Sequence, residues 1–385
     1  MKSSSPIRDA VVGCYGDWYT IQIAETLNRL NRLARLLIAF STRRLPDSLR
    51  EHASSPPAFR LRRALHRLSG KSEKFFQSNF LFGQFQDFDD VFAKSLTEKD
   101  RLVFVWAGMA RKSIAAAKRY SSKAMLLCGN AHILERQSMF RELYGRDDYI
   151  MPQWIEASLE EYETADGILV ESTYVKNSLT SRNIPHEKVF VMPPVASGYG
   201  EKISGNNNKL IFGTIQLGAR KGTDLLLSWW RRLKLYNAEL WLIGAWDSRL
   251  GPPHALPSSV RYLGYLKGPA FSEAVRQIDV AVFPTHEDGG PRSLFSLMSV
   301  GACPVTSENC AGPDHIRNGI NGFVIPLEDK NKWLETMSWC SANPAEIRRL
   351  GRNAQQYVKD HLTISCYSQF VSRLIEPEMD HYGFR

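Results

Sequence analysis

Short apolar runs alternate with segments of helical periodicity throughout the N-terminal half of the chain. The runs predict strands at residues 10–14, 102–106, 124–128, 167–170 and 189–192. Between the first two strands, apolar residues recur every three or four positions from Ile23 to Leu37, which predicts a helix over that stretch. Such an alternation of strands and helices is typical of a parallel sheet that is covered by helices.

This pattern stops at Pro193-Pro194 and then starts again. Residues 196–208, which include three asparagines in a row, show no periodicity and predict a linker. Further strands are predicted at 210–215, 240–243, 260–263, 280–283 and 303–306. We therefore expect an α/β protein with two Rossmann-like domains, residues 1–195 and 209–365, and a segment 366–385 whose helix returns to the first domain.

Two such domains predict a central cleft. Ligands of open α/β sheets bind beyond the carboxyl ends of the strands. The loops that follow Cys14, Cys128, Ile215 and Phe283 are therefore the places where we expect functional residues.

The composition bears on the cellular location of the protein and on its metal content. Hydrophobic residues make up 43% of the 385 residues, and no apolar run approaches the roughly 20 residues that span a bilayer. The first nine residues are polar and lack the apolar core of a signal peptide. Six cysteines stand singly, without the paired spacing of a zinc site. We expect a cytoplasmic protein with free thiols and no metal.

Most of the formal charge of +9 is concentrated in one segment. Residues 43–74 contain nine basic and three acidic residues, a net charge of +6. Part of this segment predicts a basic amphipathic helix that carries Arg60, Arg63 and Arg67. These arginines could contact an acceptor or the anionic inner face of a membrane, or they could simply be solvated on a helix that covers the sheet. No nucleic-acid-binding module is present, so nucleic acid is not an expected partner.

A glycine-containing turn follows the strand that ends at Ile215. Glycines such as Gly218 let a backbone approach a phosphate closely, and the next helix would present free N–H groups to an anion. Arg220 and Lys221 would add two positive charges for a diphosphate. A solvated turn with two surface cations is the alternative interpretation.

An acidic, glycine-rich loop follows the strand that ends at Phe283. A helix is predicted to begin directly after this loop, so its first N–H groups would face any anion or sugar hydroxyl there. The alternative is a loop whose acid only caps the helix. The candidate residues of the loop are Glu287, Asp288, Gly289, Gly290, Pro291 and Arg292.

Taken in order, these elements resemble the nucleotide-binding domain of glycosyltransferase family 4. The matching elements are Lys221-Gly222, the segment 262–265, the strand 279–284, the acidic glycine-rich loop, Gly301-Ala-Cys-Pro-Val305 and the run 311–326. In the first half, residues 160–176 resemble the stretch that precedes the family's linker, whereas the first 130 residues match only loosely. Several motifs in the right order are more specific than any one of them. The resemblance implies a GT-B fold, two Rossmann-like domains facing a central cleft, and a retaining mechanism.

The same resemblance implies roles for further residues. It places Tyr265 and Leu266 among the donor-binding residues, matches Gly16 to the family's first glycine-containing loop, and places His132 where the family carries a histidine that contacts the donor sugar. The chain departs from the family at one carboxylate. Where the family has two glutamates separated by seven residues, this chain has Asp288 and Ser296. The carboxylate that usually holds the ribose is therefore a hydroxyl here, which leaves the nucleotide of the donor open.

These features lead to one expectation and two alternatives. We expect a retaining glycosyltransferase that moves a hexose-like sugar from a nucleoside diphosphate to a hydroxyl of a glycan or lipid-linked acceptor, with no cofactor. His132, Asp288, Arg220 and Lys221 would carry the catalysis. The alternatives are a degenerate sugar-nucleotide-binding or scaffold subunit, which Ser296 would favour, and a GT-B sugar-nucleotide epimerase.

Overall fold

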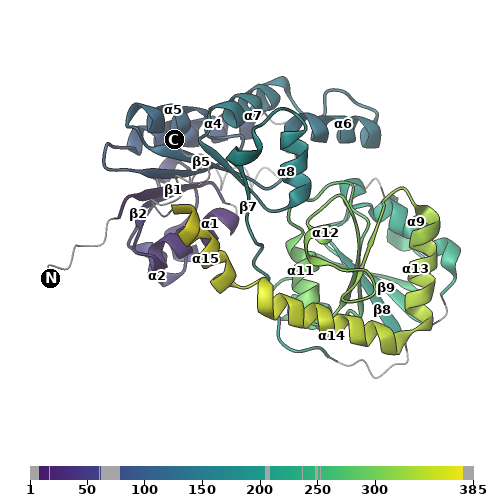
Figure 1. The fold of residues 1–385 in the computed structure, drawn as a ribbon. Coiled ribbons are helices and arrows are strands. Elements are labelled where there is room, and N and C mark those ends of the chain that lie inside the picture. Colours follow the sequence, from purple (N-terminus) through teal and green to yellow (C-terminus); the bar gives the residue numbers. More distant parts are fainter. Residues whose placement is uncertain are drawn as a thin grey trace, which may run out of the picture.

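The chain forms two α/β domains that lie side by side (Figure 1). The structure, a computed structural model, describes residues 8–16, 18–59, 61, 79–203, 209–235, 237–247, 250–251 and 253–375. Arg60, Arg63 and Arg67 of the predicted basic helix lie outside these residues. Among the described helices, none has the length and apolar character needed to cross a membrane.

The first domain is built on a seven-stranded parallel sheet with the strand order β3-β2-β1-β4-β5-β6-β7. Its central strands are buried on both faces, as expected of a sheet that is covered by helices on each side. The strands are β1 (Ala10–Cys14), β2 (Leu33–Ile38), β3 (Ala53–Ser54), β4 (Leu102–Trp106), β5 (Lys123–Cys128), β6 (Gly167–Val170) and β7 (Val189–Val191).

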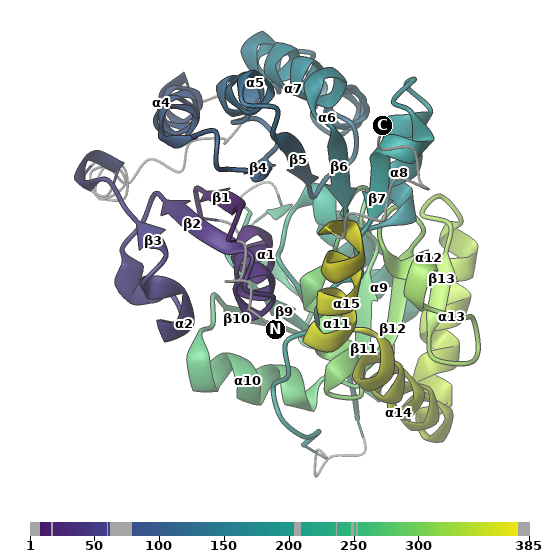
Figure 2. The same ribbon diagram turned by 60° about the vertical axis from the view of Figure 1, so that its left-hand side comes forward.

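Helices cover both faces of this sheet (Figure 2). The side chains of α4, α5 and α7 share one core with one face, and those of α1 and α15 share a second core with the other face. The helices are α1 (Trp18–Arg29), α2 (Asp47–Arg50), α4 (Asn79–Ser95), α5 (Arg111–Arg119), α6 (Ile133–Tyr144), α7 (Pro152–Thr164), α8 (Thr173–Thr180) and α15 (Ile364–Ile375), with short 3-10 turns at Thr42–Arg44 and His186–Lys188.

The helix expected from Ile23 to Leu37 is shorter than the sequence predicted. It ends at Arg29, and Asn31 takes a left-handed conformation (φ 56°) that turns the chain back. The following residues form β2, in which Leu33 pairs with Ala10 and Leu36 with Val12. The strand is apolar enough to continue a helical pattern by chance, so periodicity could not separate the two elements.

The second domain is built on a six-stranded parallel sheet with the order β10-β9-β8-β11-β12-β13. The strands are β8 (Leu210–Ile215), β9 (Ala238–Ile243), β10 (Val260–Gly264), β11 (Val280–Phe283), β12 (Cys303–Ser307) and β13 (Phe323–Ile325). The helices are α9 (Thr223–Leu233), α10 (Gly268–Gln277), α11 (Arg292–Ser299), α12 (Gly312–His315), α13 (Lys330–Ala342) and α14 (Pro344–His361), with 3-10 turns η4 (Ala219–Lys221) and Pro253–Ala255.

Two layers of helices enclose this second sheet. On one face α9 and α13 meet through Trp229 and Trp333, whose rings stack with centroids 5.0 Å apart. On the other face α11 and α14 approach closely at Gly351, where a Cβ atom would overlap the carbonyl oxygen of Gly301. Glycine is required there because the two backbones nearly touch.

The chain crosses back to the first domain at its C-terminal end. After α14, helix α15 lies against α1 (Figure 1), and its Tyr367 and Val371 are buried in the core of the first domain. The hydroxyl group of Tyr367 lies 3.8 Å from the sulfur of Met192. The backbone N–H of Ala196 donates to the carbonyl of Leu362 at 3.0 Å. This hydrogen bond joins the segment that leaves the first domain to the segment that returns to it.

Candidate functional site

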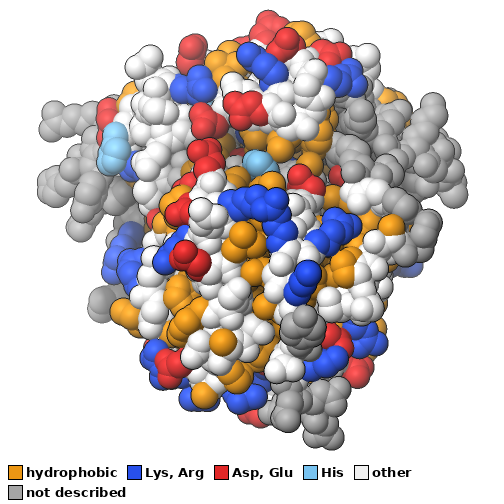
Figure 3. All heavy atoms as spheres, turned by 90° about the vertical axis from the view of Figure 1, so that its right-hand side faces the viewer, with side chains coloured by type: hydrophobic (Ala, Val, Ile, Leu, Met, Phe, Trp, Pro, Cys, Tyr) orange, Lys and Arg blue, Asp and Glu red, His pale blue; other side chains and the backbone are white. Residues whose placement is uncertain are grey.

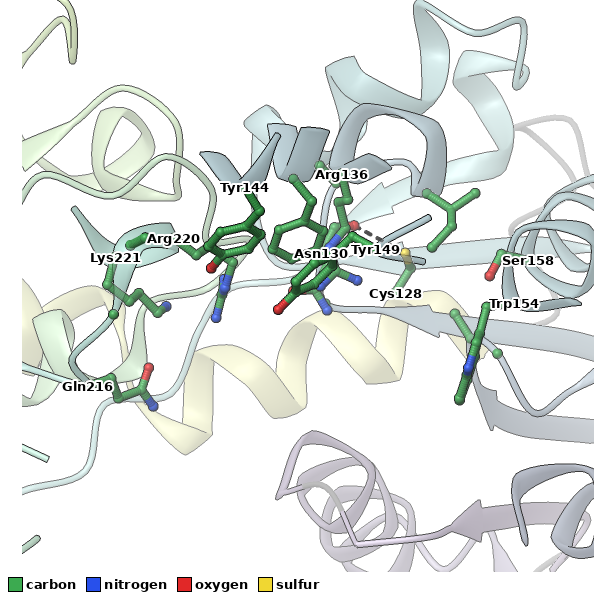
Figure 4. A pocket seen from close by; sticks show the side chains of 18 of the residues that line it. Cys128, Asn130, Arg136, Tyr144, Tyr149, Trp154, Ser158, Gln216, Arg220 and Lys221 are labelled. Carbon is green, nitrogen blue, oxygen red and sulfur yellow. Dashed lines mark hydrogen bonds between the residues drawn. The ribbon is translucent and has the colours of Figure 1, made fainter. Parts of the chain in front are cut away.

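A cavity of about 600 Å³ lies between the two domains. The first domain contributes the turn after β5, residues 129–131, and one face of α6. The second domain contributes the turn after β8, residues 216–221. Figure 4 shows Arg220 and Lys221 at one end of the cavity and Cys128, Trp154 and Ser158 at the other. The cavity thus lies beyond the carboxyl ends of two parallel strands, where α/β sheets bind ligands.

Glycines shape the turn that carries the two cations. Gly218 (φ 151°) and Gly222 (φ 65°) flank η4 with backbone conformations that favour glycine. A Cβ atom on Gly222 would overlap the carbonyl oxygen of Pro284, so the turn packs tightly against the end of β11. This packing holds Lys221 beside the acidic loop of the same domain.

Lys221 and Asp288 form an ion pair at the inner end of this turn. The lysine is only 8% exposed, and its side chain lines the cavity. Burial lowers the pKa of Lys221, and the carboxylate of Asp288 opposes that shift by stabilising the ammonium. A buried ammonium group facing a cavity is suited to an anionic ligand, which would take over part of the role of Asp288.

Glu287 joins the two domains. Its side chain is 1% exposed, and its Oε1 atom accepts a hydrogen bond from the backbone N–H of Ala131 at 3.0 Å. Its Oε2 atom accepts from Nη1 of Arg220 at 3.0 Å and lies 3.7 Å from Nε of Arg136. The same Nη1 donates to the Glu287 carbonyl at 2.7 Å. The Glu287 carboxylate is therefore occupied by partners from both domains.

Burial and the neighbouring charges shift the pKa values of the two arginines in opposite directions. Burial acts to lower the pKa of Arg220, but the carboxylates of Glu287 and Asp288 outweigh it and raise that pKa. Burial lowers the pKa of Arg136, with Glu287 acting in the opposite sense. Both groups stay charged, because a guanidinium group keeps its proton under all physiological conditions.

The glycine pair of the acidic loop packs against the first domain. A Cβ atom on Gly289 would overlap the carbonyl oxygen of Gly129, and one on Gly290 would overlap the carboxylate of Glu171. The hydroxyl group of Tyr19 donates to the carbonyl of Gly290 at 2.9 Å. In this structure the two glycines therefore permit close contact between the domains.

His132 begins helix α6 and is nearly buried, with 2% of its surface exposed. Its Nδ1 atom accepts a hydrogen bond from the backbone N–H of Leu134 at 3.2 Å, and its ring lies 5.0 Å from that of Tyr162. Burial and then the charge of Arg182 lower the pKa of His132 to about 4, so the ring is neutral at pH 7. Its neighbours Ala131 and Ile133 line the cavity, whereas His132 acts here as a helix cap.

A second cavity of about 500 Å³ adjoins the first at Gln216 and Leu217. It lies beyond the ends of β8, β9 and β10, and the predicted residues Tyr265 and Leu266 line it. Tyr265 is 70% exposed, and the ammonium group of Lys267 lies 5.0 Å from the centre of its ring. An exposed aromatic ring at the mouth of a cavity offers a flat surface for a nucleobase.

The remaining predicted residues do not line either cavity. Gly16 is in the exposed loop after β1 (φ 149°), Pro291 precedes α11, and Arg292 begins it with its guanidinium group 5.3 Å from the Tyr19 ring. Ser296 is buried within α11. Among the described residues, no group of three or more histidine, cysteine, aspartate or glutamate side chains could hold a metal ion.

Several cavity residues were not predicted from the sequence. Arg136, Phe140 and Tyr144 follow one another at four-residue intervals and form one stripe along α6. The Tyr149 ring completes this wall, 4.2 Å from that of Phe140 and 4.7 Å from that of Tyr144. Four-residue spacing could have indicated a shared face, but it could not reveal that this face meets the second domain.

Comparisons with known proteins agree with this geometry. Residues 207–343 match the family model for glycosyl transferases group 1. No curated protein sequence matches the chain. Among solved structures, HepE from Anabaena in complex with UDP and glucose is similar with a TM-score of 0.64 and 12% identity, over 95% of this chain and 99% of HepE.

Two further structures are similar over nearly the whole chain. Sucrose-phosphate synthase from Thermosynechococcus elongatus has a TM-score of 0.70 at 13% identity, over 97% of this chain and 100% of the synthase. The lipopolysaccharide outer core galactosyltransferase WaaB, in its apo form, has a TM-score of 0.58 at 13% identity, over 95% of this chain and 98% of that protein. The chain therefore has the GT-B fold, and residues 207–343 of its second half are similar to glycosyl transferases group 1.

Proposed function

We propose that this protein is a retaining glycosyltransferase that moves a hexose-like sugar from a nucleoside diphosphate to a hydroxyl group. The observation that carries the proposal is the position of the Arg220-Lys221 turn. It lines the cavity walled by both domains, and Gln216 and Leu217, shortly before it, also line the second cavity beside Tyr265. It also falls within the segment that matches glycosyl transferases group 1.

The donor would span the two cavities. Its base would occupy the cavity beside Tyr265, its diphosphate would meet Arg220 and Lys221, and its sugar would extend towards Asp288. Positive charges held in a buried site stabilise the charge that develops on a leaving diphosphate, and such electrostatic terms are usually the largest in catalysis. HepE, which shares the fold, is solved with UDP and glucose, and this supports a nucleotide-sugar donor.

The acceptor would enter from the first domain. The cavity there is walled by aromatic rings, including Tyr144, Tyr149 and Trp154, whose flat faces suit the apolar face of a sugar ring. We therefore propose a glycan or a lipid-linked sugar as acceptor. By resemblance to the family, the departing phosphate would take the acceptor proton, and no metal would be needed.

The cellular setting is also a proposal. The basic segment 43–74 supports contact with an anionic surface on the inner face of the membrane. On the face shown in Figure 3, acidic side chains gather above a hollow and Lys and Arg side chains lie below it. On this face, a negatively charged membrane would be attracted by the Lys and Arg side chains and repelled by the acidic ones.

A thermal shift measurement with a panel of nucleotides and nucleotide sugars tests the donor site. A ligand at 100 to 1,000 times its dissociation constant should stabilise the protein by roughly 3–4 kcal/mol. The shift should disappear in Lys221→Ala and persist in Lys332→Ala, which removes a surface lysine paired with Glu335. Well-folded protein that responds to none of the ligands would contradict the proposal.

Ser296 favours one alternative, a sugar-nucleotide-binding or scaffold subunit without turnover. Its hydroxyl group replaces the carboxylate that the family uses, and it lies buried in α11. Binding of a nucleotide sugar without transfer to any hydroxyl acceptor, or to water, would support that alternative. Conversion of the donor into an epimeric sugar nucleotide would instead identify an epimerase.

A further inference from the structure

Glu287 links Arg220, which the second domain presents to the cavity, to Ala131 and Arg136 of the first domain. We propose that Glu287 is a positioning residue that couples closure of the domains to the positive charge at the donor-phosphate turn, and that Arg136 is the cation the first domain adds. This inference rests on the proposed function, because it assigns a role within the same donor site.

The geometry separates the two oxygens of the carboxylate. Oε1 accepts a hydrogen bond from the backbone N–H of Ala131, and both arginines approach Oε2. Arg220 holds it at 3.0 Å, and Arg136 approaches it at 3.7 Å from the opposite domain. The two guanidinium groups therefore share one oxygen, and two positive charges face a single carboxylate.

Separation of the domains would change this balance. Ala131 and Arg136 would move away with the first domain, and Glu287 would be left with Arg220 as an isolated ion pair. In this separated state its carboxylate would neutralise the charge of Arg220. Closure returns Arg136 to Glu287, so that two guanidinium groups face this one carboxylate and the turn gains positive charge for the diphosphate.

A count of the buried charges supports the same conclusion. In the closed arrangement three cations, Arg136, Arg220 and Lys221, face two carboxylates, Glu287 and Asp288, which leaves a net charge of +1. Without Arg136 the cluster is neutral. Because charges in a buried site interact strongly, this one charge changes the attraction for a diphosphate substantially.

Arg136 reaches the cavity from the stripe on α6 that also carries Phe140 and Tyr144. Arg136 and Tyr144 lie on the same face of the helix and both line the cavity. This end of the first domain lies against η4, and the guanidinium group of Arg136 lies 5.7 Å from the centre of the Phe140 ring. Because Arg136 belongs to α6 and its guanidinium group lies over Phe140 of the same helix, movement of α6 moves this charge.

The test compares steady-state transfer from UDP-glucose, or from whichever donor of the panel the wild-type protein uses, in a small set of variants. Glu287→Gln keeps an oxygen for the Ala131 N–H but loses the charge. We expect its kcat to fall about 10- to 100-fold, because closure no longer aligns the turn, while UDP binds as tightly as to the wild-type protein or more tightly, because the cluster loses a negative charge.

Arg136 variants complete the test. Arg136→Gln should also lose at least about tenfold in kcat, Arg136→Lys should recover part of it, and the double variant with Glu287→Gln should be no slower than the slower single variant. Arg141→Gln and Glu160→Gln are matched controls, because these residues form exposed ion pairs with Asp147 and Arg111. Both controls should keep wild-type kcat.

The outcomes separate this inference from the proposed function. Full kcat in Glu287→Gln or Arg136→Gln with an active wild-type protein would overturn the inference and leave the proposed function standing. Losses that multiply in the double variant would also overturn it, because independent effects would show that Arg136 does not act through Glu287. A wild-type protein that uses no donor would overturn both. If Glu287→Gln fails to fold, the two Arg136 variants decide.

Discussion

Gly289 of the second domain packs directly against Gly129 of the first, and a Cβ atom on Gly289 would overlap the carbonyl oxygen of Gly129. These two residues are 160 positions apart in the sequence, yet their backbones lie so close that no side chain fits between them. The acidic loop can approach the first domain only because it carries no side chain at this position. The glycine therefore permits the close approach of the two domains.

Gly289→Ala should hold the domains slightly apart. The added methyl group would meet the Gly129 carbonyl and the side chain of Val175, so the Ala131–Glu287 hydrogen bond would lengthen or break. Since a displacement of about 1 Å can cost roughly 100-fold in rate, we expect kcat to fall by one to two orders of magnitude. Steady-state kinetics checks this, alongside small-angle scattering in the presence of UDP.

Gly83→Ala is the control for this variant. A Cβ atom on Gly83 would meet no atom within 4 Å, and the residue lies within α4. Alanine in a helix interior should raise stability by roughly 0.5–1 kcal/mol and leave transfer unchanged. If Gly289→Ala behaves in the same way as Gly83→Ala, the contact with Gly129 does not govern closure.

Sequence reasoning found the cations and acids of the second domain but not their partners. Lys221 and Asp288 were predicted as separate motifs, and the fold brings them into one ion pair. Arg136 could not be found, because its importance depends on which face of α6 meets the second domain. That relationship is set by the docking of two domains, and no local pattern encodes it.

Lys221→Ala should weaken binding of a nucleoside diphosphate. It removes a buried ammonium group that lines the cavity, and it leaves the carboxylate of Asp288 without its cation. Breaking a buried pair from one side typically costs about 3–5 kcal/mol, so the melting temperature should also fall. Calorimetric titration with UDP, compared with the same titration of Lys332→Ala, measures the first effect.

Asp288→Asn distinguishes the contribution of the Lys221 ammonium group from that of the Asp288 carboxylate. It leaves the ammonium group of Lys221 in place without its counter-charge, so UDP should bind as tightly as to the wild-type protein or more tightly. Transfer should nevertheless be slower, because Asp288 is proposed to position the donor sugar. Weaker UDP binding in Asp288→Asn would show that the carboxylate, and not the lysine, organises the phosphate site.

Tyr149→Ala should affect the acceptor and not the donor. Its ring packs 4.2 Å from Phe140 and 4.7 Å from Tyr144 in the wall contributed by the first domain, away from Lys221 (Figure 4). Loss of an aromatic contact in a binding site is worth about 1 kcal/mol or more, so KM for the acceptor should rise at least about fivefold. The dissociation constant for UDP should be unchanged. An equal loss of donor affinity would place the donor sugar at this wall instead.

The fold itself was largely predictable from the hydrophobic pattern. Strands β1, β4, β8 and β11 were predicted with nearly their observed bounds, because each is a short apolar run between clear breaks. The region around Leu33 was not, since a buried strand directly after a helix repeats its apolar positions. Helix α1 ends shortly before Asn31, which takes a left-handed conformation, and the chain then pairs with β1 as β2.

His132 gives a pH-dependent prediction. The histidine has a pKa of about 4 in the folded protein, against 6.5 for an exposed ring, because burial and then the charge of Arg182 disfavour its protonated form. Between these two pH values the unfolded chain binds one more proton at this position than the folded chain does. The free energy of unfolding therefore falls as the pH is lowered from 6.5 to 4, by up to about 3 kcal/mol from this group.

His132→Asn removes this titration and keeps the cap, because an asparagine oxygen can accept the hydrogen bond from the Leu134 N–H. Urea unfolding at pH 7 and at pH 4.5 should show a smaller loss of stability in the variant than in the wild-type protein. If His132 also contacts the donor sugar, as the family resemblance implies, kcat at pH 7 should fall while the helix stays intact. Unchanged kcat together with the altered pH profile would assign His132 to the cap of α6 alone.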